Sequence, residues 1–481
     1  MAYSMNVYKV LGGIILFTIS SIAILGVYST SGVGWDFISH YLNGRSIAEG
    51  FGHAINPAHA LSVGKNFYFD GVWEPLPSLL LTAFILFAGN LALPAYLLFL
   101  MAMLFLVAYA TAKSLNVDPL MLSSIMASPY VISYTVLYNG NEILAASFSM
   151  LAMGLVVAKK SEAGILTGLA GLSKYVGLAL LPMLLFVGKR RNTVRSLLLF
   201  ALVTLPWLAV NWAIFGDPLQ SYFLQLAETQ QQNLGFGAFV NMLGLVLWYP
   251  IAILAMVLAV AACFWAAHRL NDGKKLRRSI RTHEFIAERG ITILFVSLLL
   301  SLAGFAFSFD NAQGAIRLGF LVYLSASMLV AVVLDRSRVG NMMLFGKRAS
   351  EKAIPYAVFG TSMVLMIATC FNLAHSGFNL HGSVDSKNPV LSDAVSALKS
   401  TGISGCSIVS NAWPYMDYYN VTTYSPYYCN STVARMPFLL FYNISAQDYC
   451  GGSVSLMPGT YAQFKYPAFS IYLPANYMCV K

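Results

Sequence analysis

Hydrophobic stretches of similar length recur through most of this chain. They occupy residues 10–28, 91–112, 117–137, 143–158, 193–215, 241–265, 291–309, 316–334 and 354–372. Each is close to the length that a helix needs to cross ~30 Å of hydrocarbon. Only 10% of the residues are charged, whereas soluble domains carry about a quarter. The pattern excludes a soluble domain and predicts an all-α polytopic membrane protein.

The basic residues indicate orientation in a membrane. The formal net charge is +10, but most lysines and arginines stand in short runs beside the hydrophobic stretches, at 159–160, 189–195, 268–289 and 336–352. Such runs are typical of cytoplasmic loops, so no nucleic-acid partner is expected. Only Lys9 precedes the first stretch, which is too long for a secretory signal, and we expect a retained signal anchor.

Two further apolar stretches are less regular. Leu76–Gly89 is short, and Glu162–Gly188 is interrupted by glycines and Pro182. Because basic runs flank Glu162–Gly188 on both sides, both of its ends are predicted to be cytoplasmic, with a turn near Lys174. If the loop that holds Asp36 lies outside, Leu76–Gly89 cannot cross alone, and we expect a juxtamembrane or re-entrant helix.

Counting Glu162–Gly188 as a hairpin gives about eleven transmembrane helices, with the N-terminus cytoplasmic and the C-terminus extracytoplasmic. We expect a transmembrane domain at 1–373, whose first extracytoplasmic loop spans 29–90, and a small extracytoplasmic α/β domain at 374–481. The polar segments of the outer face are predicted to converge on one cavity. They are the first loop, residues 139–142, the turn at Lys174, residues 215–232, residues 309–317 and the tail.

The sequence of the tail is typical of a domain in an oxidising compartment. It holds four of the six cysteines, Cys406, Cys429, Cys450 and Cys479, and three N-x-S/T sequons, at Asn420, Asn430 and Asn443. We expect two disulfides, whose pairing the sequence does not define, and glycosylation at the sequons. Spacing predicts a helix over 391–399 and a strand over 406–409. An archaeal plasma membrane is favoured over an endoplasmic reticulum membrane.

The first loop is the richest in ionisable residues outside the basic runs. Its acidic and imidazole side chains, together with Glu142 of a later loop, are the candidates for chemistry; they are Asp36, His40, Asp70 and Glu74. Each has a simpler interpretation. Asp36 is a good helix N-cap, the loop histidines His40, His53 and His59 fit no metal-ligand spacing and suit solvent, and Glu74 and Asp70 suit an interfacial position.

Two basic residues lie near the predicted outer face. Lys174 lies at the hairpin turn and Arg317 opens a late hydrophobic stretch. Lys174 also suits a snorkelling lysine, and Arg317 suits a lipid headgroup.

Short motifs occur in a characteristic order along almost the whole chain. They are Asp36 after the first stretch, Glu74-Pro75-Leu76-Pro77, Gly168-Leu169-Ala170-Gly171-Leu172-Ser173-Lys174, Pro206-Trp207 with Asn211 through Phe215-Gly216-Asp217-Pro218-Leu219, Arg317, and Asn411-Ala412-Trp413-Pro414. With this topology the chain resembles the GT-C superfamily of integral-membrane glycosyltransferases. The resemblance is greatest to archaeal and bacterial relatives of dolichyl-phosphate-mannose protein mannosyltransferases and of aminoarabinose transferases.

The resemblance implies an inverting hexosyltransferase that moves a mannose-like sugar from a polyprenyl or dolichyl phosphate to an acceptor hydroxyl on a protein or lipid-linked glycan. It implies that Asp36 is the base, and Lys174 and Arg317 suit the leaving phosphate. Many relatives have a second acidic residue beside the first, whereas Phe37 follows Asp36 here. The requirement for a divalent metal therefore stays open. Glu142 is the alternative for the second acidic position.

Two other classes of protein fit parts of the pattern. A transporter or lipid flippase also has many crossings and glycine-broken helices, but it predicts inverted repeats and mid-helix ionisable residues, which this sequence does not show. A membrane anchor or receptor that acts through its tail predicts a membrane part without functional side chains. The ionisable residues of the first loop argue against this class.

Overall fold

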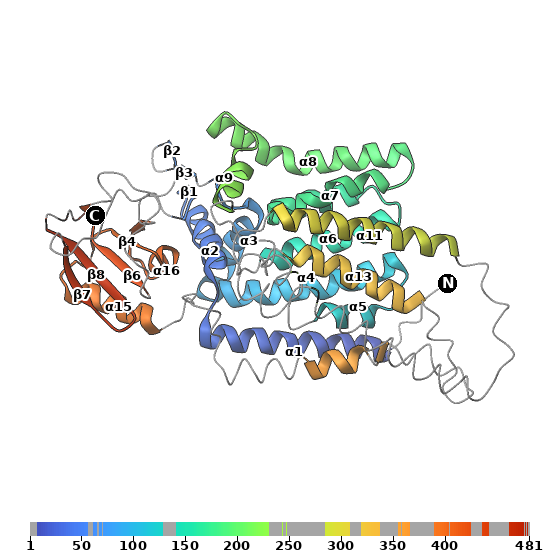
Figure 1. The fold of residues 1–481 in the computed structure, drawn as a ribbon, viewed down its shortest axis with the longest axis horizontal. Helices are drawn as coiled ribbons and strands as arrows, with labels where there is room; N and C mark the ends of the chain where they lie inside the picture. The colour runs from blue at the N-terminus through green and yellow to red at the C-terminus, as the bar shows by residue number, and fades with distance from the viewer. Residues whose placement is uncertain are drawn as a thin grey trace.

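The computed structural model describes most of the chain as a helical body with a small sheet at its C-terminal end (Figure 1). The residues it describes are 7–55, 61–64, 67–69, 71–127, 141–229, 243, 247, 284–307, 319–336, 355–356, 358–365, 389–403, 405–424, 435–441, 461–475, 477 and 479.

Helices form in the hydrophobic stretches and also in the predicted polar segments at 29–90 and 215–232. They are α1 (Val7–Ser31), α2 (Trp35–Ala48), α3 (Pro75–Ala88), the 3-10 turn η2 (Gly89–Leu91), α4 (Ala92–Leu115), α5 (Pro119–Met126), α6 (Asn141–Val157), α7 (Ala163–Ser173), the 3-10 helix η4 (Tyr175–Phe186), α8 (Arg190–Phe215), α9 (Gln220–Thr229), α11 (Glu284–Phe307) and α13 (Phe320–Arg336). A small sheet in the first loop has the order β1-β3-β2, from β1 (Gly52–His53), β2 (Leu61–Gly64) and β3 (Phe67–Phe69).

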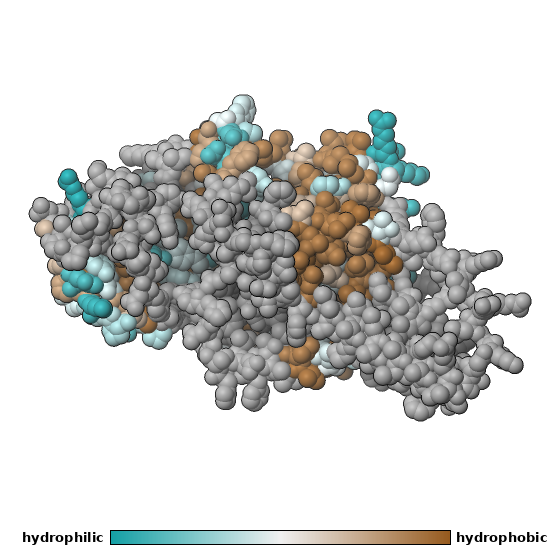
Figure 2. All heavy atoms as spheres, in the orientation of Figure 1, coloured by the Kyte–Doolittle hydropathy of each residue, from teal (hydrophilic) through white to brown (hydrophobic). Residues whose placement is uncertain are grey.

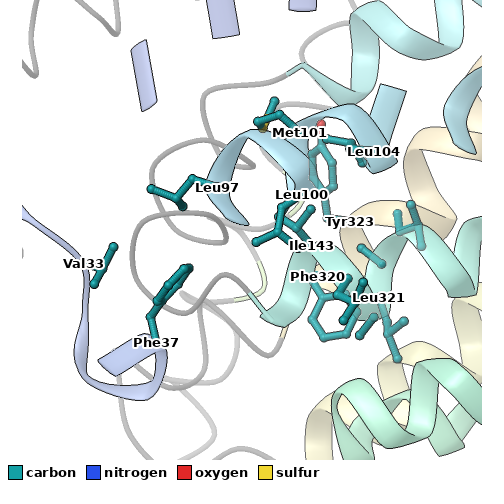
Figure 3. Packing of buried hydrophobic residues seen from close by; sticks show 14 of the residues in the cluster. Val33, Phe37, Leu97, Leu100, Met101, Leu104, Ile143, Phe320, Leu321 and Tyr323 are labelled. Atoms are coloured by element: carbon teal, nitrogen blue, oxygen red, sulfur yellow. The ribbon is translucent and has the colours of Figure 1, made fainter. Parts of the chain in front are cut away.

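The core lies between helices that run side by side. Helix α4 packs on α6, α6 on α7, α7 on α8, and α11 on α13. Figure 3 shows side chains of α4, α6 and α13 in contact there; they are Leu100, Met101, Leu104, Ile143, Phe320, Leu321 and Tyr323. The Tyr323 hydroxyl donates to the carbonyl of Ile125 at 2.6 Å. A buried hydroxyl on α13 thus has its partner on α5, as a buried polar group requires.

Two helical segments of the described residues are long and apolar enough to cross a membrane by length and composition. They are Pro75–Leu115 and Arg190–Phe215. Outward-facing apolar side chains on α8 and α11 form a broad hydrophobic area (Figure 2). The number of about eleven crossings remains a prediction.

The first long segment folds back on itself. Helix α3 ends at Gly89, whose φ of 52° is left-handed and suits glycine. The Phe84 ring then lies 5.4 Å from the rings of both Tyr96 and Phe99 on α4. A 14-residue helix is about 21 Å long, short of the ~30 Å of hydrocarbon. Helix α3 therefore has the dimensions of the predicted juxtamembrane or re-entrant helix.

The predicted hairpin of Glu162–Gly188 is confirmed. Helix α7 ends at Ser173, Lys174 is extended, and η4 returns along α7. At the far end, Asn192 Nδ2 donates to the carbonyl of Lys159 at 3.2 Å, so the two basic flanks lie together. The side of the membrane on which they stand remains a prediction.

Glycines let α7 approach α8 closely. A Cβ added at Gly164 would overlap the carbonyl oxygen of Ser196 on α8, and one at Gly168 would press on Val203. Such small residues allow membrane helices to pack backbone to backbone.

We expect Gly164→Ala to separate the two helices and to lower the free energy of unfolding by at least about 1–3 kcal/mol, the usual cost of overpacking. The control is Gly13→Ala, because a Cβ at Gly13 on α1 meets no atom within 4 Å. Thermal unfolding of both variants in the same detergent measures this. Equal melting temperatures would contradict the close approach.

The described part of the tail holds a five-stranded sheet of order β5-β4-β6-β8-β7 with two helices. Its elements are α15 (Pro389–Ser400), β4 (Ile408–Ser410), α16 (Trp413–Tyr418), β5 (Thr423–Tyr424), β6 (Phe438–Phe441), β7 (Tyr461–Lys465) and β8 (Phe469–Pro474). Strands β5, β4 and β6 are parallel, and β6, β8 and β7 are antiparallel. The helix predicted over 391–399 is confirmed as α15, and the domain boundary at 374 remains a prediction.

One of the two expected disulfides is confirmed, between Cys406 and Cys479. Cys429 and Cys450 lie outside the described residues, as do the sequons at Asn430 and Asn443. Asn420 is exposed and accepts a hydrogen bond from Arg45 Nη1 at 3.3 Å.

The tail docks on α2 through aromatic rings. Trp35 makes edge contacts with Trp413 and Tyr415 of α16, at 5.6 and 5.7 Å between ring centroids. Further along α2, Tyr41 contacts Tyr418 at 5.9 Å. The disulfide-linked sheet therefore lies at the end of the helical body where α1 ends and α2 begins (Figure 1).

Candidate active site

Asp36 is the second residue of α2 and not its cap. The cap is Gly34, and no side chain caps this helix. The N-cap interpretation of Asp36 is wrong, because the helix begins at Trp35, two residues before the start at Phe37 that such a cap requires. The carboxylate is instead buried in the first turn, where the helix dipole favours negative charge. Its Oδ2 lies 3.2 Å from Lys174 Nζ.

Lys174 lies at the turn between α7 and η4 and faces three carboxylates. Its Nζ is 3.2 Å from Asp36, 3.8 Å from Glu74 Oε1 and 3.8 Å from Glu142 Oε1. The snorkelling interpretation is wrong, because only 4% of the side chain is exposed. Gly177 lets η4 return tightly past this turn, since a Cβ there would meet the backbone of Ala170 at 2.8 Å.

Each of the three carboxylates stands at the beginning of a helix. Asp36 lies in the first turn of α2, Glu74 is the N-cap residue of α3, and Glu142 lies in the first turn of α6. The side chains of Glu74 and Glu142 are fully buried. Three acidic groups face one ammonium, and the positive ends of three helices help to stabilise the excess negative charge.

Glu74 is bound more extensively than its interfacial interpretation implies. Pro75 is the first residue of α3, and the Glu74 side chain makes no cap hydrogen bond to this helix but turns inward. Its Oε1 accepts from Gln225 Nε2 at 2.9 Å and from the Tyr175 backbone N–H at 3.4 Å. Its Oε2 lies 3.5 Å from His40 Nε2.

These contacts keep Glu74 ionised. Burial raises the pKa of the Glu74 carboxyl, but the charge of Lys174, the neighbouring His40 and the hydrogen bond from Gln225 outweigh it and hold that pKa at about 2. A carboxyl whose folded pKa is lowered contributes stability above its unfolded pKa and loses it as the pH falls toward the folded value. Glu74 thus stays a carboxylate throughout the neutral and mildly acidic range.

His40 is not solvated, contrary to the prediction for the loop histidines. It lies on α2 with 0% exposure, its Nδ1 is 3.0 Å from Ser78 Oγ, and its ring contacts Trp73. His53 is also buried, and its ring contacts Phe69. Helix α3 and the first-loop sheet cover these residues. His59, Asp70 and Arg317 lie outside the described residues.

The sequence assigns no role to three side chains of the site. Gln225 of α9 bonds Glu74, and Trp207 of α8 donates its Nε1–H to the Tyr175 hydroxyl at 3.1 Å. Asn211 accepts from the Ser221 hydroxyl and so ties α9 back to α8. The Pro206-Trp207 and Asn211 motifs were visible, but their partners become apparent only in the fold.

The cluster does not fit a divalent metal as arranged. The ammonium of Lys174 occupies the point on which the three carboxylates converge. The described residues contain no group of three histidine, cysteine or acidic side chains set to ligate an ion.

An apolar cavity of about 610 Å³ adjoins the cluster. Its lining includes the neighbours of site residues, since Pro75 follows Glu74, Leu172 lies two residues before Lys174, and Trp207 bonds Tyr175. Helix α8 forms one wall, and the outer face of that helix is exposed and apolar. A buried charged cluster thus stands beside a cavity suited to a hydrocarbon chain.

Residues 73–301 match the model of glycosyltransferase family 87. No curated protein matches the chain. Among solved structures, the chain is similar to arabinofuranosyltransferase AftD from Mycobacteria, with 12% identity and a TM-score of 0.46. The alignment covers 96% of this chain and 40% of that one, so this chain spans well under half of AftD. The family match agrees with the resemblance to glycosyltransferases, and Glu74, Glu142 and Lys174 lie within the matched residues.

Proposed function

We propose that this protein transfers a sugar, with inversion, from a polyprenyl phosphate to a hydroxyl of a protein or lipid-linked glycan on the extracytoplasmic face, and that Asp36 is the general base. A mannose-like hexose is the sugar expected. The family 87 match supports the transfer of a sugar. The apolar cavity beside a buried acidic cluster supports a lipid-linked donor.

The exposure of the three carboxylates supports Asp36 as the base. Its side chain is 7% exposed, whereas those of Glu74 and Glu142 are 0% exposed. An acceptor hydroxyl must reach the base within hydrogen-bond distance. Asp36 is therefore the most accessible of the three carboxylates.

The reaction is a single displacement. The acceptor oxygen attacks the anomeric carbon while its proton passes to Asp36, and the bond from that carbon to the phosphate oxygen breaks with its electron pair remaining on polyprenyl phosphate. One carboxylate suffices for this step, and the configuration at the anomeric carbon inverts. A positioned base of this kind contributes typically 10²- to 10⁴-fold.

Lys174 suits a different role from the phosphate contact predicted for it. A phosphate at its Nζ would also face three carboxylates within 3.8 Å. We propose that Lys174 fixes the orientation of Asp36, with Glu74 and Glu142 holding the ammonium in place. Arg317 remains the proposed contact for the leaving phosphate, since a guanidinium binds phosphate in bidentate fashion.

The extracytoplasmic assignment rests on what lies at each end of the helical body. Helix α2, which carries Asp36, contacts α16 of the disulfide-linked tail. Disulfides persist in oxidising compartments. The basic flanks at Lys159 and Arg190 lie at the far end of the α7 hairpin from Lys174.

The configuration of the product tests this proposal. The purified protein, in liposomes, receives polyprenyl-phosphate mannose of known anomeric configuration and an acceptor extract from its native membrane. We expect the mannosyl product to have the opposite configuration by NMR. Retention would contradict the single displacement, and absence of transfer from a panel of polyprenyl phosphosugars would contradict the proposed function.

A further inference from the structure

One face of helix α2 extends from the acidic cluster to the apolar cavity. Asp36, His40, Asn43 and Ile47 stand at spacings of four, three and four residues, which places them on one side of a helix. Asp36 and His40 belong to the cluster, and Ile47 lines the apolar cavity. Asn43 therefore lies between the acidic cluster and the lipid-like cavity.

The Asn43 amide is buried without a hydrogen bond. Its exposure is 0%, and neither Nδ2 nor Oδ1 has a hydrogen-bond partner among the described residues. Buried polar groups nearly always have a hydrogen-bond partner, because an unpaired group loses its hydrogen bonds to water and gains none from the protein. A leucine of similar size would fill this position at lower cost if it served packing alone.

Two polar atoms of the cluster share this property. His40 Nε2 and Glu74 Oε2 are buried and make no hydrogen bond with the described residues, although they face each other at 3.5 Å. An amide carbonyl, an amide NH₂, an imidazole nitrogen and a carboxylate oxygen together offer donors and acceptors. Neighbouring hydroxyl groups of a sugar present the matching set, because each hydroxyl both donates and accepts.

We propose that Asn43, with His40 and Glu74, binds hydroxyl groups of the sugar that is transferred. This proposal rests on the proposed function. The order along α2 agrees with it, since a lipid phosphosugar with its chain at Ile47 carries its sugar past Asn43 toward Asp36. Sites that hydrogen-bond a substrate hydroxyl reject analogues that lack it, so these residues set sugar specificity.

Asn43→Leu tests the proposal, because it keeps the size of the side chain and removes every hydrogen bond. The full chain in liposomes is titrated with polyprenyl-phosphate mannose and, separately, with polyprenyl phosphate that carries no sugar. We expect affinity for the phosphosugar to fall at least about tenfold, affinity for the sugarless lipid to stay unchanged, and the melting temperature without ligand to stay level or rise. Asn43→Ala serves as a second variant if the leucine variant does not fold.

The matched control is Asn192→Leu, because Asn192 bonds Lys159 at the opposite end of the α7 hairpin. It should bind both lipids as the wild type does. An equal loss of both lipids by the Asn43 variants, or unchanged phosphosugar affinity with a lowered melting temperature, would overturn the sugar subsite and indicate a structural amide or bound water. Failure of the wild type to prefer the phosphosugar would overturn the proposed function as well.

Discussion

Replacing Asp36 with asparagine should lower sugar transfer by roughly two to four orders of magnitude and leave donor binding nearly intact. Asparagine keeps the shape of the side chain and its carbonyl oxygen, so contact with Lys174 Nζ persists in part. It cannot take a proton from the acceptor hydroxyl. The measurement is the initial rate of transfer from labelled polyprenyl phosphosugar, with donor binding measured on the same protein.

Asp217→Asn is the matched control for this experiment. Asp217 accepts a hydrogen bond from the Leu219 N–H in the turn after α8, and asparagine serves such turns equally well. Its transfer rate should equal that of the wild type. A near-normal rate for Asp36→Asn would remove Asp36 as the base and direct attention to Glu142, the alternative acidic position in the first turn of α6.

Replacing Lys174 with methionine should destabilise the fold more than any other single change at the site. It leaves three buried carboxylates without their shared cation, and removing one partner of a buried ion pair costs about 3–5 kcal/mol. Methionine preserves the length of the side chain, so the loss reports on charge. Thermal and denaturant unfolding in detergent measure it, with exposed Lys113→Met as the control.

A second substitution separates charge from packing. In the Lys174→Met background, Glu142→Gln removes one of the unbalanced carboxylates at nearly constant volume. The double variant should recover part of the lost stability, whereas Glu142→Gln alone should not stabilise the wild type. Additive losses in the double variant would contradict an electrostatic account of the cluster.

The sequence predicted the helices better than the contacts between them. The hairpin at Glu162–Gly188 followed from basic residues at both ends, because charge placement is a local property of the chain. The meeting of Lys174 with Asp36 joins residues 138 positions apart. Periodicity and composition carry no information on such pairs, and only the packing of α2, α3, α6 and α7 brings them together.

The errors at the site have a common origin. The sequence allows Asp36 to be a helix cap and His40 to be a solvated loop residue, because it predicts that the first loop is a polar segment outside the membrane. In the structure α2 is covered by α3 and by α16 of the tail, so both side chains are buried. A residue's solvent exposure depends on elements distant in sequence, and here one of them lies beyond residue 400.

Asn43 is a proposed site residue that the sequence alone does not identify. Nothing in its sequence context marks it, since a single asparagine in a helix is ordinary. Its interest comes from a buried amide with no hydrogen-bond partner in the described part of the chain, on the helix face that carries Asp36 and His40. Identifying it requires both the helix register and the hydrogen bonds of the folded chain.

A donor comparison on the wild-type protein tests the account most directly. The protein is reconstituted in liposomes with an acceptor and either a polyprenyl phosphosugar or the corresponding sugar nucleotide, with no enzyme present that converts one into the other. The account predicts transfer from the lipid donor, lowered by roughly two to four orders of magnitude in Asp36→Asn, and none from the nucleotide. Transfer from the sugar nucleotide, or transfer from the lipid donor at equal rates by wild type and Asp36→Asn, would contradict it.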